Sequence, residues 1–277
     1  MPHPPITETA PAKINLTLHV TGRRDDGFHL LDSLVVFADL GDILTIVPAD
    51  QNSLTVIGPM APGVPETQDN LVLRAAAMMG QRAHMTLDKQ LPSAAGIGGG
   101  SSDAAACLRG LSRMSGETPP DDVLRLGADV PVCLLARSAR MRGIGEDTQP
   151  VPNLPTLHAI LVNPGVPAST PAIFRRLRQR DNPAMPNDLP TWPDTMALIR
   201  WLACQRNDLQ DPALEEVPVI TDVLEDIAAT SDCGLARMSG SGATCFGLYP
   251  EAISAANAAT ALSAKRPEWW VRSVRLS

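Results

Sequence analysis

Aromatic residues are scarce in this sequence. They make up 3% of the 277 residues, and only one of them is a tyrosine. The core therefore has to be built mainly from Leu, Val, Ile and Ala. A hydrophobic content of 44% and a charged content of 19% indicate a soluble globular protein rather than a disordered one. The length allows two modest domains or one large domain.

Positive charge is also in short supply. Lys and Arg number 23 against 30 Asp and Glu, which gives a net charge of −7. This balance argues against a partner such as a nucleic acid or an anionic membrane, because either would need a broad basic face. A small polyanionic substrate remains possible, because it needs only a local positive pocket.

Metal-binding and disulfide patterns are missing as well. The five cysteines are scattered without a C-x-x-C pair, and the five histidines lack metal-ligand spacing. No zinc site or disulfide framework is expected, and the cysteines should be buried, reduced thiols. No apolar run reaches the roughly eighteen residues of a membrane span, and the N-terminus lacks the apolar segment of a signal peptide. The expected location is the cytoplasm.

Strand and helix patterns occur in mixed order along the chain. The strands come in pairs rather than in regular βαβ alternation, which favours an α+β fold over a doubly wound sheet. The proline-rich segment QPVPNLP (149–155) is the best candidate boundary, giving domains at 1–150 and 151–277. The elements that matter below are expected strands at 13–20 and 132–136 and expected helices at 70–82, 103–114 and 213–228.

A glycine-rich run, PSAAGIGGGSSDAAA (92–106), leads into an expected helix. It lacks the spacing of a dinucleotide fingerprint and the lysine of a Walker loop. A flexible surface loop is the alternative, but such loops seldom lead directly into a capped helix. Glycines allow successive N–H groups to converge on an anion, and the helix adds a positive end. The run therefore predicts a phosphate cradle, in which Ser101 and Ser102 offer hydroxyls to phosphate or magnesium. Ser101, Ser102 and Asp103 are also possible caps of the helix that follows.

The glycine-rich run resembles the second motif of the GHMP kinases, the superfamily of galacto-, homoserine, mevalonate and phosphomevalonate kinases. PAKINL (11–16) resembles their first motif and MSGSGATCFGL (238–248) their third, in the same order. The resemblance implies a two-domain α+β kinase with its active site in the cleft between the domains, and with ATP and Mg²⁺ as cofactors. The implied ATP-binding residues are Asn70, Lys89, Pro92, Ser93, Ala94, Ala95, Gly96, Ile97, Gly98, Gly99, Gly100, Ser101 and Ser102.

Longer segments resemble one branch of this superfamily, which phosphorylates a hydroxyl of a cytidine-diphosphate-linked substrate in the non-mevalonate isoprenoid pathway. These segments are PAKINLTLHVTGRRDDGFHLLDSL, GADVPVCL, NPGVPASTPAIF and NDL (207–209). The likeness implies that Asp129 is the catalytic base and that Lys13 lies beside it and orients the acceptor hydroxyl. Without the likeness, Asp129 could equally be a solvated turn residue, and Lys13 a strand lysine that faces solvent.

The same resemblance implies a substrate side. Phe28 and Phe174 would sandwich the cytosine ring while His29 pairs with its polar edge, although each could simply be a core residue. Phe28 departs from the family's usual Gly-Tyr-His, so the phenol hydroxyl is missing. The implied substrate-binding residues are Asn15, Phe28, His29, Thr170, Phe174, Ser239, Gly240, Ser241 and Gly242.

Two rival functions stay open on sequence alone. One is another small-molecule kinase of the superfamily, such as homoserine kinase. The other is a non-catalytic nucleotide-binding protein, against which the presence of both Lys13 and Asp129 counts. The expected partner is the small cytidine-linked molecule, with no nucleic acid and no membrane, for a monomer or a homodimer.

Overall fold

Two compact units divide the chain of the computed structural model, which describes residues 4–277. Unit 1 comprises the residues up to Lys13, 40–93 and 98–136, and unit 2 comprises 14–39, 94–97 and 137–277. The chain passes from one unit to the other within strands β1 (Ile6–Asn15) and β3 (His29–Pro48) and within the glycine-rich loop. Domains at 1–150 and 151–277 stay a prediction, since these contact-based units are interleaved in sequence.

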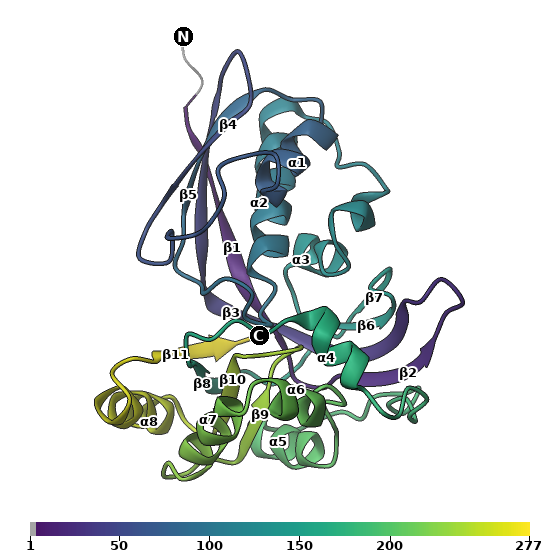
Figure 1. The fold of residues 1–277 in the computed structure, drawn as a ribbon, viewed down its shortest axis with the longest axis vertical. Helices are drawn as coiled ribbons and strands as arrows, with labels where there is room; N and C mark the ends of the chain where they lie inside the picture. Colours follow the sequence, from purple (N-terminus) through teal and green to yellow (C-terminus); the bar gives the residue numbers. More distant parts are fainter. Residues whose placement is uncertain (1–3) are drawn as a thin grey trace. The chain divides into compact units, whose positions relative to one another are not determined.

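Unit 1 packs helices beside strands. Strand β4 (Ser53–Ile57) runs parallel to β5 (Ala83–Asp88), and β5 pairs antiparallel with the second part of β3. Helices α1 (Leu71–Met78) and α2 (Gly99–Ser115) pack against each other on one side of these strands (Figure 1). The 3₁₀ turn η1 (Val123–Leu126) and helix α3 (Val130–Leu135) follow. The core is aliphatic, as the composition predicts, and includes Leu44, Ile46, Met85, Leu87, Leu108 and Leu111.

Unit 2 is built on an antiparallel sheet. Strand β8 (Leu157–Asn163) lies between β10 (Cys245–Tyr249) and β11 (Trp270–Leu276), and β10 also pairs with β9 (Leu235–Met238). Helix α7 (Val219–Ala228) packs on β9 and β10. The remaining elements are β2 (His19–Arg23), β6 (Ala139–Gly143), β7 (Asp147–Pro150), α4 (Thr170–Arg176), α5 (Thr195–Ala203), α6 (Gln210–Glu216) and α8 (Ala252–Lys265). The expected α+β class is confirmed.

Helix ends are decided by single residues. Asn70 caps α1, with its side chain accepting from the Val72 N–H at 2.9 Å. The helix stops before Arg82 because Gly80, at φ +65°, takes the left-handed conformation that ends helices. The expected caps Ser101, Ser102 and Asp103 were wrong: α2 begins after Gly98, which has φ +64° and no side chain to offer. The three residues therefore lie inside the first turns of the helix.

Three further expectations need correction. Residues 132–136 form most of helix α3 rather than a strand, because Pro131 suits a helical first turn and packing against α2 outweighs β-propensity. The helix expected over 213–228 is split into α6 and α7 at Pro218, because a residue before proline avoids the helical region. The strand expected over 13–20 breaks between β1 and β2.

The cysteines and helices complete this description. All five cysteines are free, but Cys204 is exposed and Cys233 half-buried, so the expectation that all five are buried was wrong. Within residues 4–277, no helix combines the length and the apolar character that crossing a membrane requires.

Candidate active site

Lys13 and Asp129 form an ion pair in unit 1. The distance from Lys13 Nζ to Asp129 Oδ2 is 2.8 Å. Lys13 lies near the end of β1 with its side chain 4% exposed, while Asp129 precedes α3 and remains 29% exposed. The lysine is thus held inside unit 1 and presents its charge to a carboxylate that solvent or a ligand can reach. The structure brings this expected pair together, and its catalytic role stays a prediction.

The start of α2 packs directly on this pair. A Cβ on Gly98 would lie 3.2 Å from Lys13 Cβ, so a larger residue there would press on the lysine. Ser102 Oγ donates to the Pro11 carbonyl of β1 at 2.6 Å, and Ser101 Oγ would lie 3.6 Å from a Cβ on Gly127. The glycine-to-helix junction and the ion pair therefore form one constellation.

Backbone amides are the anion-binding groups that this junction offers. The first N–H groups of α2, from Gly99 to Ser101, precede the first intrahelical bond, which runs from the Ser102 N–H to the Gly98 carbonyl at 2.8 Å. Free amides at the positive end of a 17-residue helix suit a phosphate. Ser101 is half-buried, whereas Ser102 is buried and its hydroxyl already donates to β1. Ser101 is therefore the more available hydroxyl of the two.

Two other ATP-side candidates have engaged side chains. Asn70 Nδ2 donates to the Pro65 carbonyl at 2.8 Å while its Oδ1 caps α1. Lys89 Nζ lies between two buried carboxylates, 2.5 Å from Asp42 and 2.9 Å from Asp103. Pro92 is half-buried and Ser93 exposed. The side chains of Asn70 and Lys89 thus act first on unit 1 itself, while their backbones and the 92–93 segment remain available.

In unit 2, the middle of the glycine-rich loop packs against the second glycine turn. Ala95 and Gly96 accept hydrogen bonds from the Thr244 N–H and from Ser239 Oγ, each at 3.1 Å. A Cβ on Gly96, which has φ +72°, would lie only 2.4 Å from the Ser239 carbonyl oxygen. Only glycine fits this approach. Ala94 is exposed and Ile97 buried, at the two ends of the segment.

The second glycine turn, Ser239 to Gly242, is held from two further sides in unit 2. The Asn15 N–H donates to Ser239 Oγ at 3.1 Å, and Asn15 Nδ2 donates to Ser33 Oγ at 2.8 Å. Asn15 Oδ1 is buried, and within residues 4–277 it has no hydrogen-bond partner. Asn15 therefore keeps one acceptor for a ligand, and Thr170 Oγ1 lies 2.7 Å from Ser241 Oγ at the same turn.

Asn207 also holds this turn, a role that the sequence analysis missed. Its Nδ2 donates to the carbonyls of Met238 and Gly240, both at 2.8 Å. Its Oδ1 accepts from the Leu209 N–H at 3.0 Å. Only the N-D-L pattern pointed to this position. The pattern carried no role, because the two carbonyls that Asn207 Nδ2 binds lie more than thirty residues away.

An aromatic pair forms the other substrate-side feature of unit 2. His29 stacks on Phe174 with ring centroids 4.6 Å apart and an interplanar angle of 21°. Burial, reinforced by Arg23 and Arg180, lowers the pKa of His29 below its ordinary value, so the imidazole is neutral at neutral pH. Its buried Nε2 has no partner among the described residues. Phe28 is 59% exposed, so His29, not Phe28, faces Phe174 here.

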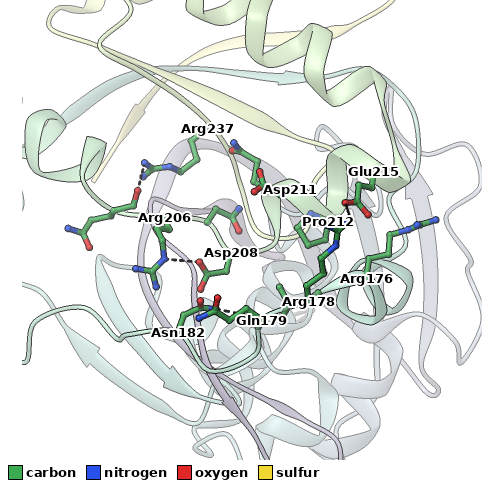
Figure 2. Close-up of a pocket in the computed structure, with 14 residues that line it drawn as sticks. Arg176, Arg178, Gln179, Asn182, Arg206, Asp208, Asp211, Pro212, Glu215 and Arg237 are labelled. Carbon is green, nitrogen blue, oxygen red and sulfur yellow. Dashed lines mark hydrogen bonds and ion pairs between the residues drawn. The ribbon is translucent and has the colours of Figure 1, made fainter.

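A pocket of about 500 Å³ also opens on unit 2 (Figure 2). It contains none of the expected site residues, and three of its arginines are already paired: Arg176 with Glu216, Arg178 with Glu215 and Arg206 with Asp208. The fourth, Arg237, donates to the carbonyls of Leu16, Leu202 and Gln205. Three of the four arginines are thus paired with carboxylates, and the guanidinium of Arg237 is engaged by backbone carbonyls.

The donor set of unit 1 bears on magnesium. No group of three His, Cys, Asp or Glu side chains in residues 4–277 is arranged to hold a metal ion. Mg²⁺ in kinases is usually held by substrate phosphates with one or two protein groups. The half-buried Ser101 hydroxyl at the start of α2 fits the role of such a protein group.

Comparison with known proteins identifies the family. Residues 70–137 match the family described as "GHMP kinases N terminal domain", and residues 188–268 match the family described as "GHMP kinases C terminal". A 4-diphosphocytidyl-2-C-methyl-D-erythritol kinase from Dinoroseobacter shibae is 59% identical over 96% of this chain and 93% of its own length. The protein of the same name from Paracoccus denitrificans is 55% identical over 98% of this chain and 96% of its own length.

Solved structures agree with this assignment. A crystal structure of 4-(cytidine 5'-diphospho)-2C-methyl-D-erythritol kinase superposes with a TM-score of 0.80 at 34% identity, covering 98% of this chain and 99% of the other. A homoserine kinase from Cytophaga hutchinsonii, with a TM-score of 0.65 at 15% identity over 99% of this chain and 94% of its own, shares the fold alone. The chain belongs to the 4-diphosphocytidyl-2-C-methyl-D-erythritol kinase family of the GHMP kinases.

Proposed function

We propose that this enzyme transfers the γ-phosphoryl group of ATP to the 2-hydroxyl of 4-diphosphocytidyl-2-C-methyl-D-erythritol. The observation that carries the proposal is the Lys13–Asp129 ion pair of 2.8 Å, packed against the start of α2. A protein that only bound nucleotide would not need an accessible carboxylate beside a buried cation at a phosphate cradle. The full-length likeness to kinases of this name supplies the acceptor.

Asp129 is the base of the proposed reaction. Its carboxylate takes the proton of the acceptor hydroxyl while the hydroxyl oxygen attacks the γ-phosphorus. The bond from that phosphorus to the β–γ bridging oxygen breaks, and ADP leaves with the electron pair. Lys13 holds the carboxylate in place and balances negative charge that gathers near the transferring group.

The amides of Gly99 to Ser101 bind the phosphates in this proposal. They lie at the positive end of α2, and the absence of side chains at the two glycines allows a close approach. Magnesium, when bound, would neutralise negative charge that develops on the phosphates. Ser101 is the residue that would hold it to the protein, because Asp129 has to stay free to accept the proton.

His29 and Phe174 are proposed to recognise the cytosine ring. Phe174 gives an aromatic face, and the neutral His29 has an unpartnered Nε2 that can hydrogen-bond a polar base edge. Phe28 is free to close on the base from the other side, since its ring is 59% exposed. The segment from Ser239 to Gly242, with Thr170 and Asn15, would contact the rest of the substrate through hydroxyls and amides.

A coupled assay of ADP release tests the proposal. The purified enzyme is given ATP and Mg²⁺ with the cytidine-linked substrate, with homoserine, or with no acceptor. ADP release that depends on the cytidine-linked substrate is the expected result. Release with homoserine alone would favour the other kinase, and ATP binding without release in any arm would favour a nucleotide-binding protein.

A further inference from the structure

Three buried charged residues bracket the glycine-rich loop in unit 1. Lys89 Nζ contacts Asp42 Oδ2 at 2.5 Å and Asp103 Oδ2 at 2.9 Å. The three side chains are 3%, 0% and 5% exposed, respectively. Lys89 lies just before the loop, Asp103 lies in the second turn of α2 just after it, and Asp42 lies on β3. The cluster therefore ties both ends of the loop to one strand.

Asp42 also fixes the backbone that enters the loop. Its Oδ1 accepts from the N–H groups of Gln90 and Leu91, at 2.6 Å and 2.9 Å. On the exit side, a Cβ on Gly99 would lie 3.6 Å from Lys89 Nζ and 4.0 Å from Asp42 Oδ2. The first turn of α2, whose amides face the proposed phosphate position, thus rests directly on the cluster.

This cluster is poorly suited to stabilising the fold. Burying three charged groups carries a large desolvation penalty, which apolar side chains of similar volume would avoid. Two carboxylates share one ammonium, and within residues 4–277 Asp103 Oδ1 has no partner. Burial and the neighbouring Asp42 raise the pKa of Asp103 to about 7, against the opposing pull of Lys89. What the cluster supplies instead is a fixed geometry between residues 89–91 and the start of α2.

We infer that Asp42, Lys89 and Asp103 are positioning residues for ATP: the cluster fixes the positions of the loop amides that bind the phosphates. The Lys89 ammonium itself does not contact the nucleotide. The inference rests on the proposed role of the loop in binding ATP phosphates. The Lys89 ammonium is already held by two carboxylates, so it is not available for a direct contact with ATP. Its function is therefore to position the loop.

A double-mutant cycle separates positioning from contact. Asp103→Asn, Lys89→Met and the double variant are compared with the wild type by calorimetry with ATP and by steady-state kinetics. Each single variant should weaken ATP binding by about tenfold, as loss of one charge-assisted bond does, with kcat at saturating ATP little changed. The double variant should bind ATP about as tightly as the single variant that has the lower affinity, because both changes break the same cluster.

Other outcomes overturn the inference. If Asp103→Asn binds ATP as the wild type does while Lys89→Met does not, the ammonium contacts the nucleotide directly. If both variants lose only thermal stability and keep the KM for ATP, the cluster serves the fold alone. Leu111→Ala is the matched control: it removes a buried side chain from the same helix, away from the cluster, and should lower Tm without changing the KM for ATP.

Two precautions keep the result interpretable. Lys89→Met leaves two buried carboxylates without a cation and could fail to fold, in which case Asp103→Asn against Leu111→Ala still decides, because an amide keeps the shape of the carboxyl. A wild-type enzyme that binds ATP but releases no ADP with the cytidine-linked substrate would refute the proposed function and leave the bracket testable by calorimetry.

Discussion

The two units hold their candidate site residues by different means. Unit 1 uses charge: the buried Lys13 with the accessible Asp129, and the buried cluster of Lys89 with Asp42 and Asp103. Unit 2 uses uncharged groups: the His29–Phe174 stack and the glycine and serine backbone around Gly96 and Ser239. Fixed charges suit the handling of phosphate and protons, and neutral, shape-defined surfaces suit a base and a polyol. Changes at the charged residues of unit 1 should therefore alter turnover or ATP binding, and changes at the aromatic pair of unit 2 should alter the KM of the acceptor.

The largest effect should come from Asp129→Asn in unit 1. The amide keeps the shape but cannot accept the proton, so kcat should fall by roughly two to four orders of magnitude. ATP affinity should stay near that of the wild type. Release of ADP in single-turnover and steady-state assays measures the first quantity, and calorimetry the second.

A matched variant guards this test. Asp122→Asn removes another carboxylate of unit 1, which is 52% exposed and paired only with exposed Arg125. It should keep full turnover. If Asp129→Asn is as active as Asp122→Asn, Asp129 is not the base. The charged residues of unit 1 would then not account for turnover.

The next effect concerns the phosphate cradle. Gly98→Val would force a branched side chain onto a residue with φ +64° and onto Lys13, so it would mix strain with binding. Gly99 has no such strain, and its Cβ would meet neighbours at 3.6 Å or more. Gly99→Val should therefore fold, and loss of two charge-assisted bonds to phosphate should weaken ATP binding by roughly a hundredfold.

Calorimetry and thermal denaturation together measure this effect. If Gly99→Val binds ATP normally while retaining the Tm of the wild type, the α2 amides do not bind the phosphates. If Gly98→Val loses only stability, its glycine serves the packing of Lys13 alone.

Local signals in the sequence predicted much of this arrangement. Asn70 caps its helix because a cap depends on residues two or three positions away. The glycine-rich run was recognisable because glycine takes positive φ most readily and because no Cβ fits the close backbone approach at Gly96. Lys13 and Asp129 were paired only through the family resemblance, since 116 residues separate them in the sequence.

Interactions with distant residues were not predictable. Asp42 lies 47 residues before Lys89, and no local pattern relates an acidic residue on one strand to a lysine on another. Helix α3 reads as a strand locally, because its burial against α2 is what selects the helix. His29 was expected to read a base edge, and its stacking on Phe174 depends on a contact across 145 positions.

Phe174→Ala tests the recognition half of the comparison. Stacking of a base on an aromatic ring is worth about 1–3 kcal/mol, so the KM for the cytidine-linked substrate should rise roughly ten- to a hundredfold. The KM for ATP should stay nearly constant. Phe174 also packs on the core of unit 2, so a loss of Tm is expected as well.

Leu177→Ala is the control for that loss of packing. Leu177 follows Phe174 by one helical turn and is 5% exposed in the same core. It should lower Tm without changing the KM for the cytidine-linked substrate. If the KM for the cytidine-linked substrate rises equally in both variants, or if the KM for ATP rises as well, Phe174 is a core residue and does not bind cytosine.

The smallest effect should come from Phe28→Tyr, which restores the residue usual in the family. The ring is 59% exposed, and a surface substitution of this kind usually changes stability by no more than about 0.5 kcal/mol. If Phe28 acts only by its aromatic face, the added hydroxyl should change the KM for the cytidine-linked substrate by less than about twofold. Phe28→Ala should raise the same constant by roughly tenfold, because it removes the face itself.

Steady-state kinetics on the two variants measure the difference between ring and hydroxyl. A tenfold lower KM in Phe28→Tyr would mean that unit 2 also recognises its substrate through a phenol hydrogen bond that this chain lacks. An unchanged KM in Phe28→Ala would leave His29 and Phe174 as the whole recognition surface for the base.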